Sequence, residues 1–132
     1  MAEQITKFNT NLIKLLKELE KYYPDSGEII TLNNRIKILK NELGREMLIE
    51  KCGPEIYVYK EKIYAREMDF FRNFNNIKKM SNIDDSKKNY NLVITIFRMA
   101  SEIYPKLPKA NQDEMYDRLL ILLDSYIKYK KL

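Results

Sequence analysis

The stretch ITKFNTNLIKLLKELEKYY, residues 5–23, repeats apolar side chains at alternating spacings of three and four residues. An α-helix has about 3.6 residues per turn, so this spacing places those side chains on one stripe of a helix. The stripe comprises Ile5, Phe8, Leu12, Leu15, Leu19 and Tyr22, widened by Ile13, Leu16 and Tyr23. Pro24 disfavours helical geometry in the residue before it. The stretch therefore predicts an amphipathic helix over about residues 3–22, with one face in a core.

The next segment repeats the pattern. Residues 25–28, Asp-Ser-Gly-Glu, have the form of a capping box, and Gly44 can supply a left-handed residue at the end of a helix. Between them the apolar positions are Ile29, Leu32, Ile36, Leu39 and Leu43. We predict a short third helix at 46–52. Gly53 ends this helix, and Pro54 starts the next one.

The remaining segments are predicted from the same signals. Residues 56–64 include β-branched and aromatic side chains that also suit a strand, but 60–69 are compatible with a helix and no hairpin turn follows, so we favour a helix. Residues 73–89, rich in Asn, Lys, Ser and Asp, predict one long polar loop. Two further helices are expected. The apolar positions of the first are Tyr90, Val93, Phe97, Ala100 and Tyr104. The second follows a capping box at 111–114 and should be well buried; its apolar positions are Met115, Leu119, Leu122, Tyr126 and Tyr129.

Composition agrees with a helical protein. The 132 residues are 45% hydrophobic and 33% charged, with only three Gly and four Pro, which argues against both a disordered chain and a turn-rich β protein. A domain of this length buries roughly two-thirds of its unfolded surface, so its core needs no metal or disulfide. The sequence predicts an all-α, single-domain bundle of five or six helices over residues 1–132.

The residue inventory disfavours most catalytic sites. There is no histidine, which removes the usual general base and imidazole ligand, and Cys52 is the only cysteine, which excludes zinc sites built from these side chains. Acid pairs at 46/50 and 113/117 can share a helix face, but acids near a helix start are explained by the helix dipole. We expect no enzyme activity, catalytic residues, metal, cofactor or small-molecule substrate.

The net charge of +5 and the lone cysteine bear on location and partners. A single cysteine gives no reason to expect an oxidising compartment. No apolar run approaches the roughly 20 residues that a membrane span needs, and no signal peptide precedes the first helix. We expect a soluble protein that is not secreted and does not enter membranes.

A basic and aromatic group surrounds the predicted loop. Basic side chains can hold phosphates while exposed aromatic rings stack on bases; the basic candidates are Arg72, Lys78, Lys79, Lys87 and Lys88. The aromatic residues are Phe70, Phe71 and Phe74, and consecutive Phe residues are more typical of anchors that hold a loop to a core. Within AREMDFFRN, residues 65–73, we expect the end of a helix, with Arg66, Glu67 and Asp69 at the surface.

Three segments together resemble a known family. FNTNLIKLLKELEKYYP (8–24), IYAREMDFF (63–71) and YPKLPKANQDEMYDRLLILLDSYIKY (104–129) resemble, in order, short proteins of the nucleocytoplasmic large DNA viruses of algae and amoebae. The matching positions are Phe8 and Asn9, Tyr23 and Pro24, Glu67, and Phe70 and Phe71. Met68 stands where the family has a second acid, which argues against a metal or catalytic role for the acidic pair.

The resemblance implies a viral origin and no enzymatic activity. We expect a non-enzymatic virion or viral-factory component that acts through protein–protein contacts or self-association, located in the host cytoplasm, the viral factory or the virion. Ten tyrosines favour this reading, since aromatic rings are enriched in interface cores. The alternative is a nucleic-acid-binding accessory protein that uses the basic loop 72–88.

Overall fold

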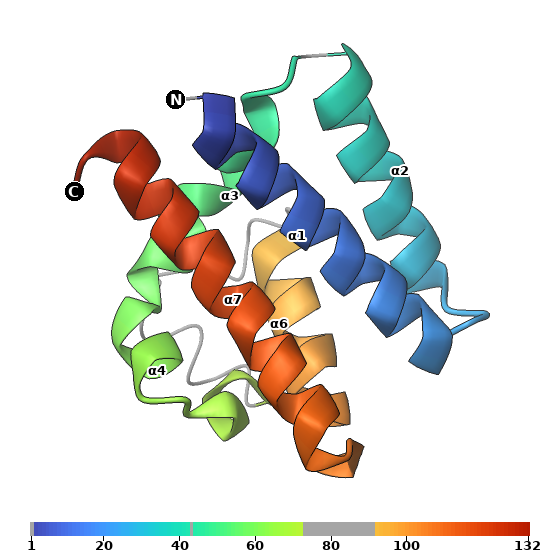
Figure 1. Ribbon diagram of the computed structural model, residues 1–132. Helices are drawn as coiled ribbons and strands as arrows, with labels where there is room; N and C mark the ends of the chain where they lie inside the picture. The colour runs from blue at the N-terminus through green and yellow to red at the C-terminus, as the bar shows by residue number, and fades with distance from the viewer. Residues whose placement is uncertain (1, 43, 73–91) are drawn as a thin grey trace, which may run out of the picture.

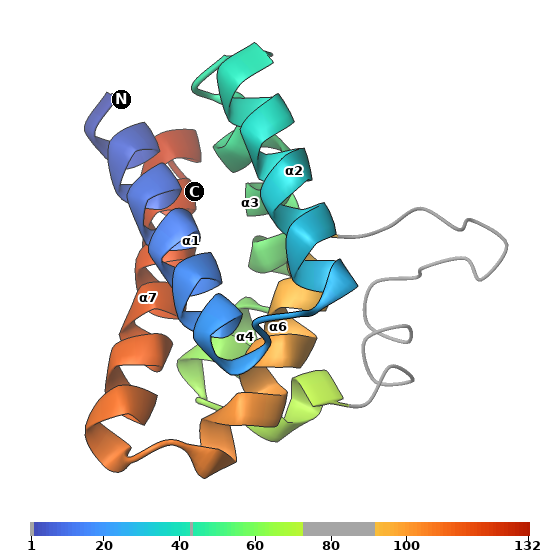
Figure 2. The same cartoon turned by 90° about the vertical axis from the view of Figure 1, so that its right-hand side faces the viewer.

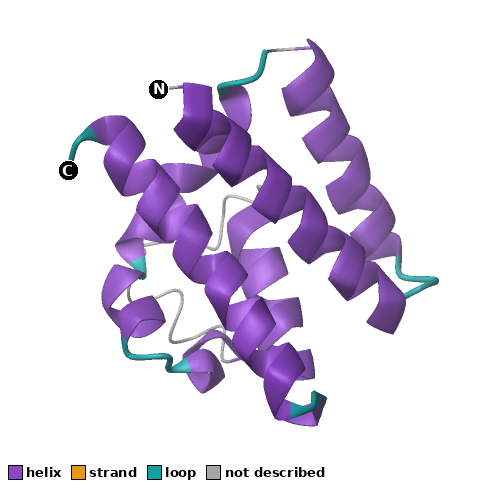
Figure 3. Ribbon diagram, viewed as in Figure 1, coloured by secondary structure: helices purple, strands orange, loops and turns teal. Residues whose placement is uncertain are grey.

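The computed structural model describes residues 2–42, 44–72 and 92–132, and within these ranges all regular elements are helical (Figures 1 and 3). The predicted all-α bundle is therefore confirmed, whereas the predicted loop at 73–89 lies outside the described residues. The elements in chain order are α1 (Ala2–Tyr22), α2 (Gly27–Glu42), α3 (Met47–Val58), α4 (Lys60–Tyr64), the 3₁₀ turn η1 (Met68–Arg72), α6 (Leu92–Ile103), the 3₁₀ turn η2 (Tyr104–Lys106) and α7 (Lys109–Lys130).

α1 and α7 form the most extensive helix pair and run antiparallel, with the two chain ends at the same end of the bundle (Figure 1). Five of the six residues predicted for the apolar stripe of the first helix are buried, namely Ile5, Phe8, Leu12, Leu15 and Leu19. Tyr22, at the last turn, is 47% exposed, so its predicted place in the core is wrong. Figure 2 shows α2 beside α1 on the side away from α7. α1 therefore occupies the middle of one face of the molecule, with one stripe in the core and the opposite stripe outward.

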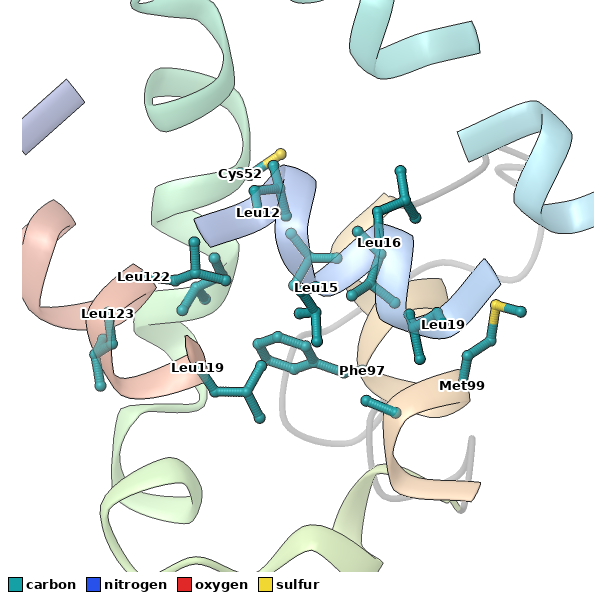
Figure 4. Packing of buried hydrophobic residues seen from close by; sticks show 14 of the residues in the cluster. Leu12, Leu15, Leu16, Leu19, Cys52, Phe97, Met99, Leu119, Leu122 and Leu123 are labelled. Atoms are coloured by element: carbon teal, nitrogen blue, oxygen red, sulfur yellow. The ribbon is translucent and has the colours of Figure 1, made fainter. Parts of the chain in front are cut away.

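α6 is the most enclosed helix. Nine of its residues are buried, and they surround it on all sides: Val93, Ile94, Thr95, Ile96, Phe97, Met99, Ala100, Ser101 and Ile103. Side chains from α1 and α7 converge on it, as Figure 4 shows for Leu15, Leu119 and Phe97. A helix that is apolar around its circumference requires neighbours on every side, so α6 has to lie inside the bundle.

The predicted helix boundary at Gly53–Pro54 is wrong. α3 continues through both residues to Val58 and ends at Tyr59, whose N–H donates to the Ile56 carbonyl at 3.1 Å. Pro54 costs one backbone hydrogen bond but does not stop the helix. Gly53 is explained by packing, because an added Cβ would stand 2.1 Å from Cδ1 of the Tyr126 ring in α7.

The helix starts differ from the predicted capping boxes. Ser26 caps α2, where its Oγ accepts from the Ile29 N–H at 3.4 Å, and Glu28 pairs with Arg98 of α6. α7 begins at Lys109 after the extended Pro108, with no side-chain cap. The predicted helix end before Pro24 is confirmed, and Gly44 has the expected positive φ of 109°.

Candidate interaction surfaces

The helix end that the sequence predicted within residues 65–73 comes at the start of that stretch. α4 ends at Tyr64, and Arg66 has a positive φ of 56°, a conformation that few residues other than glycine adopt. The chain then tightens into the 3₁₀ turn η1. The reversal at Arg66 turns the chain so that η1 packs against α6.

Arg66 is half-buried, whereas the sequence predicted a surface position for it. Its Nε donates to the Tyr104 hydroxyl at 2.7 Å and its Nη2 pairs with Asp113 at 2.5 Å. The guanidinium also lies 4.6 Å from the centre of the Tyr116 ring. The hydrogen bond to Asp113 raises the pKa of Arg66, so the charge is permanent. Arg66 thereby ties the reversed segment to η2 and α7.

A hollow of about 470 Å³ opens beside this arginine. Its described lining is Arg66, Glu67, Met68, Asp69, Phe70 and Tyr104. The charges around it are already paired: Glu67 with Lys62 at 2.8 Å, Asp69 with Arg72, and Arg66 with Asp113. Paired charges leave no excess of either sign to attract an ionic ligand, so the hollow has no evident chemistry of its own.

The two phenylalanines of η1 differ in burial. Phe71 is 1% exposed and its ring meets those of Tyr59 and Phe97 edge-on, with centroids 5.5 and 4.9 Å apart. Phe70 is half-buried, and the Lys62 ammonium lies 5.1 Å from its ring centre. Such packing suits an anchor for the chain that follows. That role stays a prediction, because Phe74 and the rest of that segment lie outside the described residues.

Of the five basic residues predicted to contact nucleic acid, the structure describes Arg72. Arg72 is exposed at the end of η1 and pairs with Asp69 three residues before it. Lys78, Lys79, Lys87 and Lys88 lie outside the described residues. Nucleic-acid binding by the loop therefore stays a prediction.

The outer side of α2 carries apolar residues that the sequence patterns did not single out. Ile30 is 58% exposed and Ile38 is 48% exposed, and the uncharged Asn34 stands midway between them. At about 100° per residue the three fall within an arc of about 80°. We call these three residues the α2 outer face. Their regular spacing of four was the available signal, but the stronger stripe of Ile29, Leu32 and Ile36 concealed it.

The protein is 31% identical over 129 residues to an uncharacterized protein of African swine fever virus, strain Badajoz 1971 Vero-adapted, in an alignment that covers 98% of this chain and 93% of the relative. The counterpart of that protein in the isolate Tick/South Africa/Pretoriuskop Pr4/1996 is 30% identical over the same coverage. The chain belongs to the family of these two viral proteins. No protein-family model and no solved structure matches it.

Membership of this family confirms the sequence resemblance at the level of the virus group, because African swine fever virus is a nucleocytoplasmic large DNA virus. The near-complete coverage of both chains means that the swine fever virus proteins and this one share their whole length rather than one motif. Among the residues that the structure describes, no helix is long and apolar enough to cross a membrane.

The reactive thiol and the carboxylates of this viral protein are buried or held by hydrogen bonds and ion pairs. Burial raises the pKa of the Cys52 thiol to about 12, so the nucleophilic thiolate is scarce at neutral pH. Glu50 accepts from the Tyr129 hydroxyl at 2.6 Å and pairs with Lys130 at 3.0 Å. Within the described ranges no three acidic, cysteine or histidine residues are grouped to hold a metal.

Proposed function

We propose that this protein is a non-enzymatic interaction protein of a nucleocytoplasmic large DNA virus and acts through protein–protein contacts in the virion or the viral factory. The observation that carries the proposal is the α2 outer face, with Ile30 and Ile38 exposed on either side of Asn34. Single exposed apolar residues are normal, but two isoleucines aligned over about 12 Å of one helix form a stripe that a partner helix can cover.

The rest of α2 supports this proposal. Its inner residues Ile29, Leu32 and Ile36 are 2%, 0% and 4% exposed and hold the helix against the bundle. The helix thus carries apolar side chains on two faces, and only one of them is buried within the described part of the chain. Covering the exposed half of each isoleucine would stabilise a complex by about 1 kcal/mol per residue.

The location of the protein in the infected cell is part of the same proposal. We propose the host cytoplasm, the viral factory or the virion as its location, and expect relatives in viruses of algae and amoebae as well. The length-matched relatives in African swine fever virus support a viral setting. The free, buried Cys52 fits a reducing compartment.

The experiment compares affinity capture from infected cells with the wild-type protein and with the Ile30→Glu/Ile38→Glu variant. The matched control is Val58→Glu/Leu132→Glu, which alters two other apolar side chains that are 41% and 63% exposed. A protein retained by the wild type and the control, and weakened at least about tenfold by two buried charges in the α2 variant, is the partner.

The captured protein is then purified and titrated directly against the three forms. Sedimentation at increasing concentration decides whether the partner is a second copy of this chain, in which case only the α2 variant stays monomeric. Equal retention by the wild type and the α2 variant, with no self-association, would overturn the role of the α2 outer face.

A further inference from the structure

The outward stripe of α1 is strongly basic. Lys7, Lys14, Lys17 and Lys21 are all exposed, and at about 100° per residue they fall within an arc of about 80°. They extend over about 21 Å, since each helical residue rises 1.5 Å. The one acid on this arc is Glu3, which pairs with Lys7 at 3.2 Å. Figure 1 shows α1 running between α2 and α7, so no other described helix covers this stripe.

The acids beside these lysines on α1 are Glu18 and the exposed Glu20, which lies three residues after Lys17. Glu18 lies four residues after Lys14, but its Oε1 accepts from the Arg118 Nε of α7 at 3.1 Å. Within the described part of the chain, no ion pair joins Lys14, Lys17 or Lys21 to a carboxylate. Like charges three and four residues apart destabilise a helix. α1 therefore bears a repulsion that a bound polyanion would relieve.

A cation from another element extends the stripe. Arg45, in the turn before α3, has a guanidinium whose Nη2 donates to the Thr6 hydroxyl of α1 at 2.9 Å in an exposed hydrogen bond. Its carbonyl accepts from Nδ2 of the buried Asn9 at 3.1 Å, which fixes the backbone of the turn against α1. Arg45 is thus held on the flank of the helix. We call Lys7, Lys14, Lys17, Lys21 and Arg45 the α1 basic face.

We propose that the α1 basic face binds the phosphate backbone of double-stranded DNA without reading its sequence. The phosphates of one strand follow a helical path around the duplex, so a stripe of about 21 Å can reach about three to five phosphates on the side of the duplex that faces it. The hydroxyl of exposed Thr10, between Lys7 and Lys14, can donate to a phosphate oxygen. The relatives in a large DNA virus favour DNA over RNA as the duplex.

The composition of the face distinguishes this ligand from other polyanions. Single-strand binders combine cations with several stacking rings, whereas Phe8 is buried here and one ring, the half-exposed Tyr22, lies beside Lys21. A membrane-surface helix needs an exposed apolar face, whereas the apolar stripe of α1 is in the core. A duplex carries its phosphates on the outside and requires neither several stacking rings nor an apolar face, so it is compatible with this row of cations.

The test is fluorescence anisotropy of the full chain with a labelled mixed-sequence duplex of about 20 base pairs. Three to five phosphate contacts predict a slope of log K against log salt between about −3 and −4.5, a loss of roughly 60- to 500-fold from about 50 to 200 mM salt. Lys14→Gln/Lys17→Gln/Lys21→Gln should make the slope less negative by about 2.7. The control Lys37→Gln/Lys106→Gln/Lys109→Gln, with the same charge change at exposed sites elsewhere, should keep the wild-type slope.

Several results would overturn the proposal. They are no binding at about 50 mM salt, equal slopes for the α1 variant and the wild type, and tighter binding to a single strand of equal length or to phosphatidylserine vesicles. Loss of binding only in Lys78→Gln/Lys79→Gln/Lys87→Gln/Lys88→Gln would assign DNA to the loop instead. The outcome is independent of the α2 outer face, because the Ile30→Glu/Ile38→Glu variant leaves all five cations in place.

Discussion

Gly53 is the residue whose identity the structure constrains most tightly. Replacing it with alanine places a methyl group within 2.1 Å of the Tyr126 ring, which itself is 7% exposed and cannot turn into solvent. Alanine favours a helix interior by about 1 kcal/mol over glycine, but overpacking of a core costs about 1–3 kcal/mol or more. We expect Gly53→Ala to lower the free energy of unfolding by about 1–2 kcal/mol in urea denaturation.

Gly27→Ala is the control for this prediction. A Cβ at Gly27 would meet no atom within 4 Å, and the residue opens α2. The expected change is within about 0.5 kcal/mol of zero. Equal effects of the two substitutions would mean that the contact between α3 and α7 relaxes freely around position 53.

Two tyrosines should make stability depend on alkaline pH. Burial and a hydrogen bond to Glu102 raise the pKa of Tyr23 to about 12, and a hydrogen bond to Glu50 raises the pKa of Tyr129 to about 12. Unfolded tyrosine has a pKa near 10.0, so the folded chain holds these protons more tightly. The stabilisation is complete below about pH 10 and is lost as pH rises from about 10 to about 12.

Urea unfolding at about pH 9 and about pH 11 measures this effect. Tyr23→Phe/Tyr129→Phe should lose less stability across that interval than the wild type does. Tyr22→Phe, an exposed position, should lose as much as the wild type. A double variant whose stability falls as steeply as that of the wild type would show that the two hydroxyls titrate alike in both states.

Arg66 illustrates what cannot be predicted from sequence at this scale. Its partners Tyr104 and Asp113 lie 38 and 47 residues further along the chain, and no local pattern connects them. The sequence marked AREMDFFRN as a segment of mixed charge and aromatic character, but it predicted a surface position for the arginine. The positive φ of Arg66 also has no signal in the residue type, because few residues other than glycine adopt it.

At the scale of elements, the α1 basic face implies a conflict between stability and binding. Lys17→Glu would place an acid three residues after Lys14 and four before Lys21. Two repulsions become attractions, while the attraction between position 17 and Glu20 becomes a repulsion. At about 0.2–0.5 kcal/mol per pair, the unfolding free energy should rise by about 0.4–1 kcal/mol in urea denaturation. Affinity for duplex DNA should fall in the same variant. A variant that is both less stable and equally competent in binding would contradict both expectations.

Periodicity predicted the helices well because their stability comes from one buried stripe each. It did so for α1, where Ile5, Phe8, Leu12, Leu15 and Leu19 are buried as predicted, and it failed at Tyr22, which the helix end leaves exposed. Boundaries were less predictable, because Gly53 and Pro54 have two physical uses. Local rules treat them as terminators, whereas contact with the distant Tyr126 ring explains the glycine here. The α2 outer face was not predicted, because the core-facing stripe gives the stronger periodic signal on the same helix.

At the scale of the whole molecule, α2 is held differently from the other long helices. It packs against α1 and α3 and has no extensive contact with α7. Its first turn is tied to α6 by Arg98, which pairs with Glu28 and, at 3.0 Å, with Glu102. The Tyr23 hydroxyl donates to the same Glu102 at 2.8 Å, so this polar cluster fastens the α1–α2 turn to α6. A helix fastened at its start and exposed along its outer side is the element most able to adjust to a partner.

Hydrogen exchange measures this arrangement. Amides of α6 are enclosed by the core and should exchange only on global unfolding, whereas those of α2 should exchange through local opening. Arg98→Gln removes a partly exposed pair worth up to about 1 kcal/mol, so exchange in the first turn of α2 should accelerate about two- to fivefold. Arg118→Gln, which breaks the pair with Glu18 between α1 and α7, should leave α2 unchanged. Acceleration in α2 by both variants would mean that the bundle opens as one unit, and a partner of the α2 outer face would then meet a rigid surface.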